Sequence, residues 1–407
     1  MRLIDAVKSR ENNFDVLRLF GALLVLVSHS YALSGKAEPT IAGVSFGAVG
    51  VFIFFGISGF LVTKSWVHQP RLGAFFAKRA LRILPALLLV SLLTAYVIGP
   101  LVTTTSLQSY FGSPLTHAYA LRNATLRTDY LLPGVFAHNA YPSAVNGSLW
   151  TLPTEARAYA GVAILGLFVT FMLGWRPRLR RPKASRRFVF IGSAVVLAIG
   201  LVAAILKASG HAPADYGVSL PSPKQVTGGF SQWYLFLEFA VGGALYLGRS
   251  RVALRWDAFA AVIAVWFAAS HATMLPHSFR TEFVPALVIP YATLVLAFRG
   301  SPRWRKLTAW GDMSYGVYLW AFPVQQVIAL KLGSSVTPLA MIALSLPITC
   351  LLGAASWFAV ERRALRLKPG RRPAPAPPVA EPGLLTAPAA VEFPHAAVEP
   401  TVPAVAS

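Results

Sequence analysis

Charged residues are scarce in this chain, and acidic residues are scarcer than basic ones. Only 13% of its 407 residues are Asp, Glu, Lys or Arg, whereas 55% are hydrophobic. A soluble globular protein usually has about a quarter of its residues charged. The composition therefore excludes an ordinary soluble protein and indicates an all-α protein that crosses a membrane several times.

Residues that bind metals or form crosslinks are also few. Cys350 is the only cysteine and lies in the last apolar run, which excludes an intrachain disulfide and a thiolate metal cluster. The eight histidines have no close ligand spacing, so the sequence predicts no metal site. No internal repeat is visible.

Long apolar runs, by contrast, are frequent. About 20 apolar residues are needed to cross roughly 30 Å of hydrocarbon in a helix. Ten segments meet or approach this length, and we predict that each forms a transmembrane helix. These segments are residues 14–33, 46–66, 83–104, 155–174, 188–206, 232–248, 258–275, 282–298, 312–332 and 337–360.

The 37 basic and 15 acidic residues give a net charge of +22, which in a soluble chain would suggest nucleic-acid binding. Here the basic residues cluster in every second connection between the predicted helices, namely near 71–82, 176–187, 249–255 and 299–306. By the positive-inside rule these connections are cytoplasmic, and an even number of helices places both termini there too. The charge therefore reports topology, and we expect no nucleic-acid partner.

Two regions differ from the apolar helices. Residues 369–407 are rich in Pro and Ala and have little apolar surface to bury, so we predict a disordered cytoplasmic tail after a transmembrane domain of residues 1–368. The connection at about 105–154 is the longest and is dense in aromatics. Structureless loops of that length are uncommon, so we expect it to fold over the outer face.

The first apolar run, FDVLRLFGALLVLVSH, contains charged and titratable residues that a simple anchor does not need. Arg18 and His29 are eleven residues apart, which places them on one helix face and about 16 Å apart along the axis. Asp15 lies on the same face, three residues before Arg18, and is a possible ion-pair partner.

Five segments together resemble the membrane-bound acyltransferase type 3 family, in the same order along residues 13–368. They are FDVLRLFGALLVLVSHS, GAVGVFIFFGISGFLVTKSW, FFAKRALRILPAL, NGSLWTLPTEARAY and GDMSYGVYLWAFPVQQ. The resemblance implies a ten-helix enzyme of the bacterial cytoplasmic membrane that moves an acyl group, commonly acetyl from acetyl-CoA, to a saccharide hydroxyl. Acyl-CoA would be a donor substrate, with no tightly bound cofactor.

The resemblance assigns the chemistry to His29 and Glu155. A neutral imidazole can take the acceptor proton or carry the acyl group near neutral pH. His29 corresponds to the family histidine; the alternative is a polar group that is hydrogen-bonded between helices. Glu155 would share a cavity with His29 and orient it, or would instead be an acidic residue at a helix N-terminus. Trp150 offers a stacking face for a sugar.

The same resemblance assigns donor binding to basic residues. Arg18 would face the phosphates or pantetheine arm of CoA, or would only pair with Asp15. Arg79 and Arg82 lie on adjacent helical turns and would grip an anionic nucleotide, although ordinary positive-inside charge in contact with lipid phosphates also explains them.

Two further positions, Ser58 and Ala321, lie in the segments that resemble the family. Ser58 in GISGFLV lies between glycines, which favours close helix packing; a role as nucleophile would need a neighbouring base that the sequence does not reveal. Many relatives have a histidine where Ala321 stands, so a role of that histidine does not transfer to this chain.

The sequence thus predicts an O-acyltransferase that uses acyl-CoA and a glycan acceptor. A transporter that uses Arg18, His29 and Glu155 as a substrate or proton pathway is the main alternative, although inverted repeats that would favour it are not seen. A scaffold protein is a second alternative, and it would tolerate the loss of His29.

Overall fold

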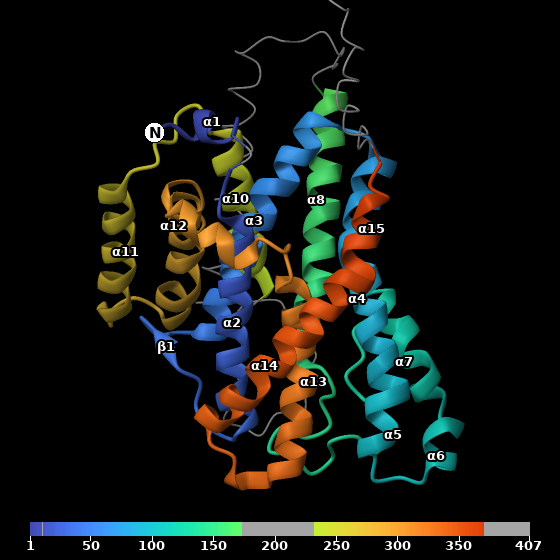
Figure 1. Cartoon of the computed structure of the whole chain (residues 1–407). Helices are drawn as coiled ribbons and strands as arrows, with labels where there is room; N and C mark the ends of the chain where they lie inside the picture. The colour runs from blue at the N-terminus through green and yellow to red at the C-terminus, as the bar shows by residue number, and fades with distance from the viewer. Residues whose placement is uncertain (10, 173–231, 370–407) are drawn as a thin grey trace, which may run out of the picture. The chain divides into compact units, whose positions relative to one another are not determined.

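The computed structural model describes residues 1–9, 11–172 and 232–369, and most of these residues are helical (Figure 1). The predicted span at 188–206 lies outside the described residues, as does the predicted tail from residue 370 onwards. The longer helices are α2 (Phe14–Leu33), α3 (Phe46–His68), α4 (Leu72–Leu93), α8 (Thr151–Met172), α10 (Gln232–Leu247), α11 (Trp256–His271), α12 (Val284–Arg299), α13 (Ser314–Leu332) and α14 (Pro338–Ser356).

Shorter elements connect and extend these helices. The short α-helices are α1 (Leu3–Ala6), α5 (Gly99–Val102), α6 (Leu107–Gly112), α7 (Pro114–Ala124) and α15 (Arg362–Arg366). The 3-10 helices are η2 (Gly147–Trp150), η4 (Pro302–Thr308) and η5 (Gly333–Ser335), and the π-helical turns are η1 (Thr94–Ile98), η3 (Phe279–Phe283) and η6 (Trp357–Glu361). Strands β1 (Thr40–Ile41) and β2 (Val44–Ser45) pair antiparallel, with Thr40 opposite Ser45.

Five helices in the described part of the chain are long and apolar enough to cross a membrane. They are Phe14–Leu33, Phe46–His68, Leu72–Val102, Phe279–Arg299 and Pro338–Arg366, and the last three include π-helical turns. Two shorter apolar helices, Trp233–Leu247 and Trp256–His271, lie where further spans are predicted. The helical class of the membrane protein is therefore supported, whereas the number of ten spans and the side of each terminus stay predictions.

The helix that contains the third predicted span begins earlier in the chain than predicted. We expected it at 83–104, but the helix starts at Leu72 and continues through η1 and α5 to Val102. Lys78, Arg79 and Arg82 therefore lie within a helix rather than in the loop before it. The start of this helix is not visible as an apolar run because it contains Lys and Arg. Both residues are nevertheless good helix formers, and their long side chains can lie along apolar surface.

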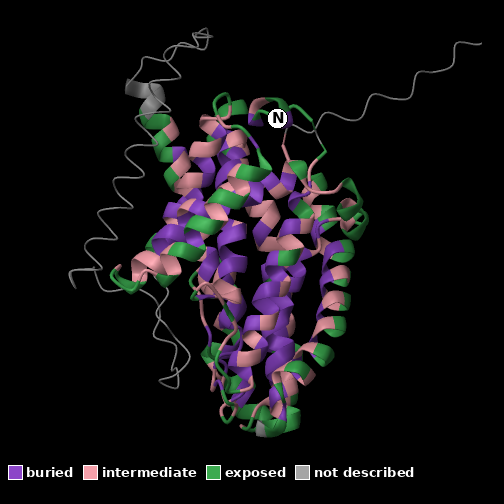
Figure 2. Ribbon diagram, turned by 90° about the vertical axis from the view of Figure 1, so that its left-hand side faces the viewer, coloured by how far each residue is buried: buried purple, intermediate pink, exposed green. Residues whose placement is uncertain are grey.

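Helix α3 packs directly against α2, α10 and α12 (Figure 1). The buried residues concentrate on the faces where the helices meet (Figure 2). Glycines allow the closest approaches: a Cβ on Gly50 would lie 2.4 Å from the carbonyl oxygen of Gly21, and one on Gly59 would lie 1.8 Å from that of Phe239. The glycine-rich GISGFLV segment thus has the packing role that its composition favours.

The segment between α7 and η2 lies on α13. Gln326 Nε2 donates hydrogen bonds to the carbonyls of Tyr141 (2.9 Å) and Ala144 (2.7 Å), and Asn146 Nδ2 donates to Leu319 O (2.9 Å). Irregular backbone at this depth is tolerated because protein, rather than lipid, satisfies its polar groups. The segment leads to the start of α8, where Thr151 contacts Tyr318 in the second turn of α13.

Candidate active site

A cavity of about 420 Å³ lies between α2, α3, α4, α8 and α13. Five basic and three acidic residues line it, together with apolar and hydroxyl side chains. The basic residues are Arg18, Lys78, Arg79, Arg82 and Lys368, and the acidic residues are Asp15, Glu155 and Asp312. The excess of positive charge suits an anionic ligand of modest width.

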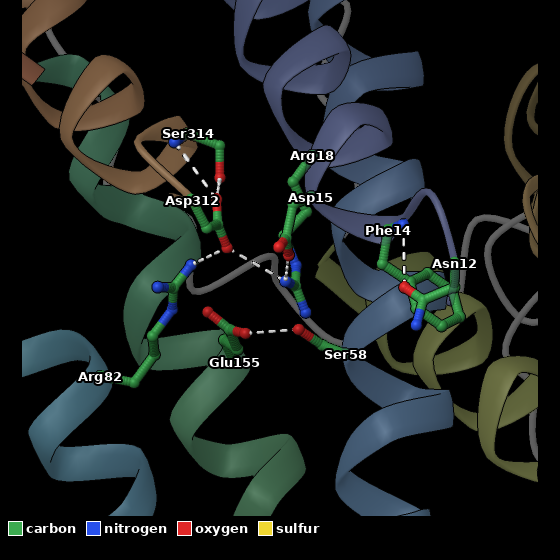
Figure 3. A network of polar contacts seen from close by, with 9 residues as sticks. All are labelled: Asn12, Phe14, Asp15, Arg18, Ser58, Arg82, Glu155, Asp312 and Ser314. Atoms are coloured by element: carbon green, nitrogen blue, oxygen red, sulfur yellow. Dashed lines mark hydrogen bonds and ion pairs between the residues drawn. The ribbon is translucent and has the colours of Figure 1, made fainter. Parts of the chain in front are cut away.

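Asp312 joins two of the arginines (Figure 3). Arg18 Nη1 lies 3.1 Å from Asp312 Oδ2 and 3.0 Å from Asp15 Oδ1. Arg82 Nη2 lies 2.5 Å from the same Oδ2 atom. The hydroxyl and the backbone N–H of Ser314 donate to the other oxygen of Asp312. The predicted ion pair of Arg18 with Asp15 is therefore present, and the carboxylate of Asp312 also binds Arg18. Asp312 holds the guanidinium groups of both Arg18 and Arg82 at the cavity wall.

Arg79 differs from these two arginines because it forms no ion pair within the described residues. Its Nη1 donates to the carbonyl of Phe75 (2.9 Å), and its guanidinium carbon lies 3.9 Å from the centre of the Phe75 ring. Its Nε is buried without a hydrogen-bond partner in the part of the chain that the structure describes. Of the two arginines predicted to bind a nucleotide, Arg79 thus retains more donor capacity for a ligand.

Glu155 lies in the second turn of α8 and accepts two hydrogen bonds through Oε1. Ser58 Oγ donates at 2.7 Å, and the hydroxyl of Tyr159 donates as well (Figure 3 shows the Ser58 contact). The carboxylate neighbour of Ser58, which the sequence did not reveal, is therefore Glu155. All three side chains line the cavity.

His29 lies away from these residues, near the opposite end of α2 from Arg18. Its ring packs edge-on against Phe322, with 5.1 Å between ring centres, and its Nδ1 is buried without a hydrogen-bond partner among the described residues. Phe322 follows one helical turn after Tyr318, which lines the cavity and packs against Phe54. The cavity lining therefore reaches Tyr318, about one helical turn along α13 from Phe322, the aromatic neighbour of His29.

The structure does not bring Glu155 and His29 together, contrary to the expectation of a shared cavity. Gly47 of α3 lies beside Ser28, the neighbour of His29. Ser58, which contacts Glu155, follows eleven residues later and thus about 16 Å along α3. The cause is the start of α8 at Thr151, where its hydroxyl pairs with that of Tyr318 (2.7 Å), so that Glu155 points to the arginine end.

Trp150 is also absent from the cavity lining. It is half-buried at the end of η2 and packs against the main hydrophobic core. Arg18, Arg79, Arg82 and Glu155 thus meet in one cavity, whereas His29 and Trp150 do not line it. The functional roles of all six stay predictions.

Two cavity residues escaped the sequence analysis. Asp312 is the second residue of the GDMSYGVYLW segment and the first residue of the predicted span 312–332, so the signal for it was an acidic residue at the start of an apolar run in a chain with few acids. Lys368 is close to the end of the described chain and lines the cavity. Burial, and then the charges of nearby arginines such as Arg82 and Arg79, lower the pKa of Lys368 to about 8.

The Lys368 pKa predicts a pH-dependent affinity for an anionic ligand. Protonated Lys368 attracts the anion, so affinity is highest below pH 8 and falls by about fivefold, or roughly 1 kcal/mol, as the pH rises through 8. Titration calorimetry with CoA at several pH values measures this change. Lys368→Arg keeps its charge and should give a flat profile, whereas a flat wild-type profile would contradict the prediction.

These features define a helical membrane protein with a basic cavity between its helices. Comparison with known proteins then identifies the family: a sequence model described as an acyltransferase domain matches residues 11–358. The chain belongs to the acyltransferase type 3 family, as its motifs predicted.

Two characterised relatives agree with this assignment. An O-acetyl transferase of Shigella phage Sf6 is 29% identical over 360 residues, covering 88% of this chain and 96% of the relative. Nodulation protein 10 of Rhizobium leguminosarum bv. viciae is 29% identical over 380 residues, covering 88% and 94%. No solved structure matches the chain.

Proposed function

We propose that the protein is an O-acetyltransferase of the bacterial cytoplasmic membrane. It takes acetyl from acetyl-CoA, which enters the cavity from the cytoplasm, and transfers it to a hydroxyl of a surface or exported glycan. The family assignment and the name of the phage relative support acetyl transfer to oxygen. The single observation that carries the proposal is the basic cavity, whose inner end approaches the neighbour of His29.

The dimensions of the site support this donor. Arg18 and His29 are about 16 Å apart along α2, a distance that an extended pantetheine arm can span. The phosphates of CoA would lie against Arg79 and Lys368, which have no ion-pair partner within the described chain. Ser58 and Glu155 would contact the arm between the two ends, because they line the cavity beside Arg82.

His29 would act where the thioester arrives. Its imidazole takes the proton of the acceptor hydroxyl while that oxygen attacks the thioester carbonyl. The new C–O bond forms, the C–S bond breaks, and the leaving sulfur receives the proton from His29. The products are an acetyl ester and CoA thiol. This role uses the buried Nδ1 or the other ring nitrogen as the base and requires no metal ion.

Sidedness tests the proposal directly. Membrane vesicles that contain the protein and an acceptor glycan are prepared either inverted or right-side-out and given [acetyl-labelled] acetyl-CoA, which does not cross bilayers. Label is expected in the glycan with inverted vesicles only. Transfer with sealed right-side-out vesicles would contradict donor entry from the cytoplasm, and absence of transfer in both preparations would overturn the proposed function.

Donor binding gives a second prediction. Arg79→Gln removes a cation that has no other ionic partner in the described structure, so the Kd for CoA should rise about tenfold, as expected for loss of one charged hydrogen bond. Arg303→Gln, in the exposed η4 turn, is the matched control. Equal CoA affinity of the two variants in calorimetry would exclude Arg79 from donor binding.

A further inference from the structure

Two carboxylates are candidates for a partner of His29: Glu155, which the sequence suggested, and Glu38, which the structure places beside Ser28. We propose that Glu38 positions His29 and stabilises the imidazolium that forms during transfer. This inference rests on the proposed function, in which His29 is the base. Glu38 is therefore a positioning residue, because it acts on the acceptor through the imidazole.

The connection between α2 and α3 places Glu38 next to the start of α3. Glu38 follows His29 by nine residues and precedes the β1–β2 hairpin. The N–H of Phe46, the first residue of α3, donates to the carbonyl of Pro39 at 2.9 Å. The backbone beside Glu38 is thus tied to the helix end.

The carboxylate of Glu38 turns back towards α2. Its Oε2 accepts a hydrogen bond from the hydroxyl of Ser28, the residue immediately before His29. Gly47, in the first turn of α3, leaves room for this contact: a Cβ there would lie 3.0 Å from Ser28 Oγ and 3.7 Å from Glu38 Oε2. The amino end of the 23-residue helix α3 favours an ionised carboxylate at this position.

His29 lies within the electric field of this carboxylate. Among the described residues, Glu38 is the charged group that interacts electrostatically with the imidazole of His29. Tyr141, whose ring packs 5.9 Å from that of Phe322, is the other titratable group that faces Glu38. Ser28 from α2, Gly47 from α3, Tyr141 and Phe322 therefore surround the pair.

The arrangement suits a base that becomes charged. A cationic imidazole is costly in a buried, low-dielectric site unless an anion is near. Ser28 holds Oε2 of Glu38, whereas Oε1 forms no hydrogen bond in the described chain. The Nδ1 of His29 is likewise without a partner there. In the proposed arrangement Oε1 of Glu38 accepts Nδ1–H of His29, which leaves the second ring nitrogen to take the acceptor proton.

Kinetics of Glu38→Gln, Glu38→Asp and the control Glu11→Gln test the proposal in membranes with matched insertion. Glu38→Gln is expected to lower kcat by about 30-fold, less than the loss of a general base itself (roughly 10²–10⁴-fold) because Glu38 acts through the imidazole, while the KM for acetyl-CoA changes less than about threefold. The acid limb of the pH–rate profile moves to lower pH, because protonated His29 loses its counter-ion. Glu38→Asp should restore the wild-type limb in part, and Glu11→Gln, which removes an exposed carboxylate that pairs with Arg305, should leave its position unchanged.

Three results would overturn the proposal. The first is a Glu38→Gln protein with wild-type kcat and pH profile. The second is an equal loss of kcat in Glu38→Asp and Glu38→Gln without movement of the acid limb, because this result indicates a structural role only. If Glu38→Gln fails to insert, Ser28→Ala is measured instead, because it removes the hydrogen bond that holds the Glu38 carboxylate. An unchanged acid limb in Ser28→Ala is the third result that would overturn the proposal. Absence of transfer by the wild type would instead overturn the proposed function, and this inference with it.

Discussion

A His29→Ala protein that inserts at the wild-type level is expected to transfer acetyl about 1000-fold more slowly. The estimate is the middle of the range for removal of a general base. His29→Gln should be equally slow, because an amide keeps hydrogen-bonding capacity but cannot take a proton at neutral pH. The measurement is the rate at which label from acetyl-CoA appears in the glycan.

The Gln variant separates catalysis from structure. If His29 were only a polar group between helices, Gln would retain activity and Ala would lose stability rather than rate. His68→Ala, at the opposite end of α3 from Gly47, is the control for the loss of an imidazole. Normal transfer by both His29 variants would discard the mechanism and favour a transporter or scaffold.

A Gly59→Ala protein is expected not to reach a stable fold. The added Cβ would lie 1.8 Å from the carbonyl oxygen of Phe239, so α3 and α10 would have to separate by more than about 1 Å. Backbone cannot rotate out of the way as a side chain can, and the cost should exceed about 3 kcal/mol. Size-exclusion profiles and thermal unfolding in detergent measure the loss.

Gly161→Ala is the matched control for this substitution. Gly161 also lies within an apolar helix, α8, but a Cβ there meets nothing within 4 Å. Alanine is the better helix former, so this variant should be as stable as the wild type or slightly more stable. A Gly59→Ala protein with the same unfolding temperature as Gly161→Ala would show that the α3–α10 contact is looser than described.

The helices were predictable where apolar runs and helix ends coincide. Residues 14–33 form α2 as predicted, and α3 and α10 begin at the expected residues. The start of α4 at Leu72 was not predicted, because basic residues in its first turns interrupt the apolar run. The start of α8 at Thr151 was predicted four residues too late, since η2 and α8 are nearly continuous.

Contacts within the site were less predictable than the helices. The Arg18–Asp15 pair follows from helical spacing alone, but Asp312 is 294 residues from Arg18 and meets it only through the packing of α13. The same holds for Ser58 and Glu155. The sequence paired Glu155 with His29 because both were placed near one membrane face, whereas the depth at which α8 begins decides which residues Glu155 can reach.

The attachment of the α7–η2 segment to α13 limits how either piece can be exchanged. Each side of the contact supplies side-chain donors to the other: Gln326 of α13 donates to the segment, and Asn139 and Asn146 of the segment donate to α13. A chimera that exchanges the segment alone and lacks these two asparagines would leave the side-chain oxygen of Gln326 and the carbonyl of Leu319 without these donors. The two pieces therefore form one unit of inheritance, and recombination or protein engineering has to transfer them together.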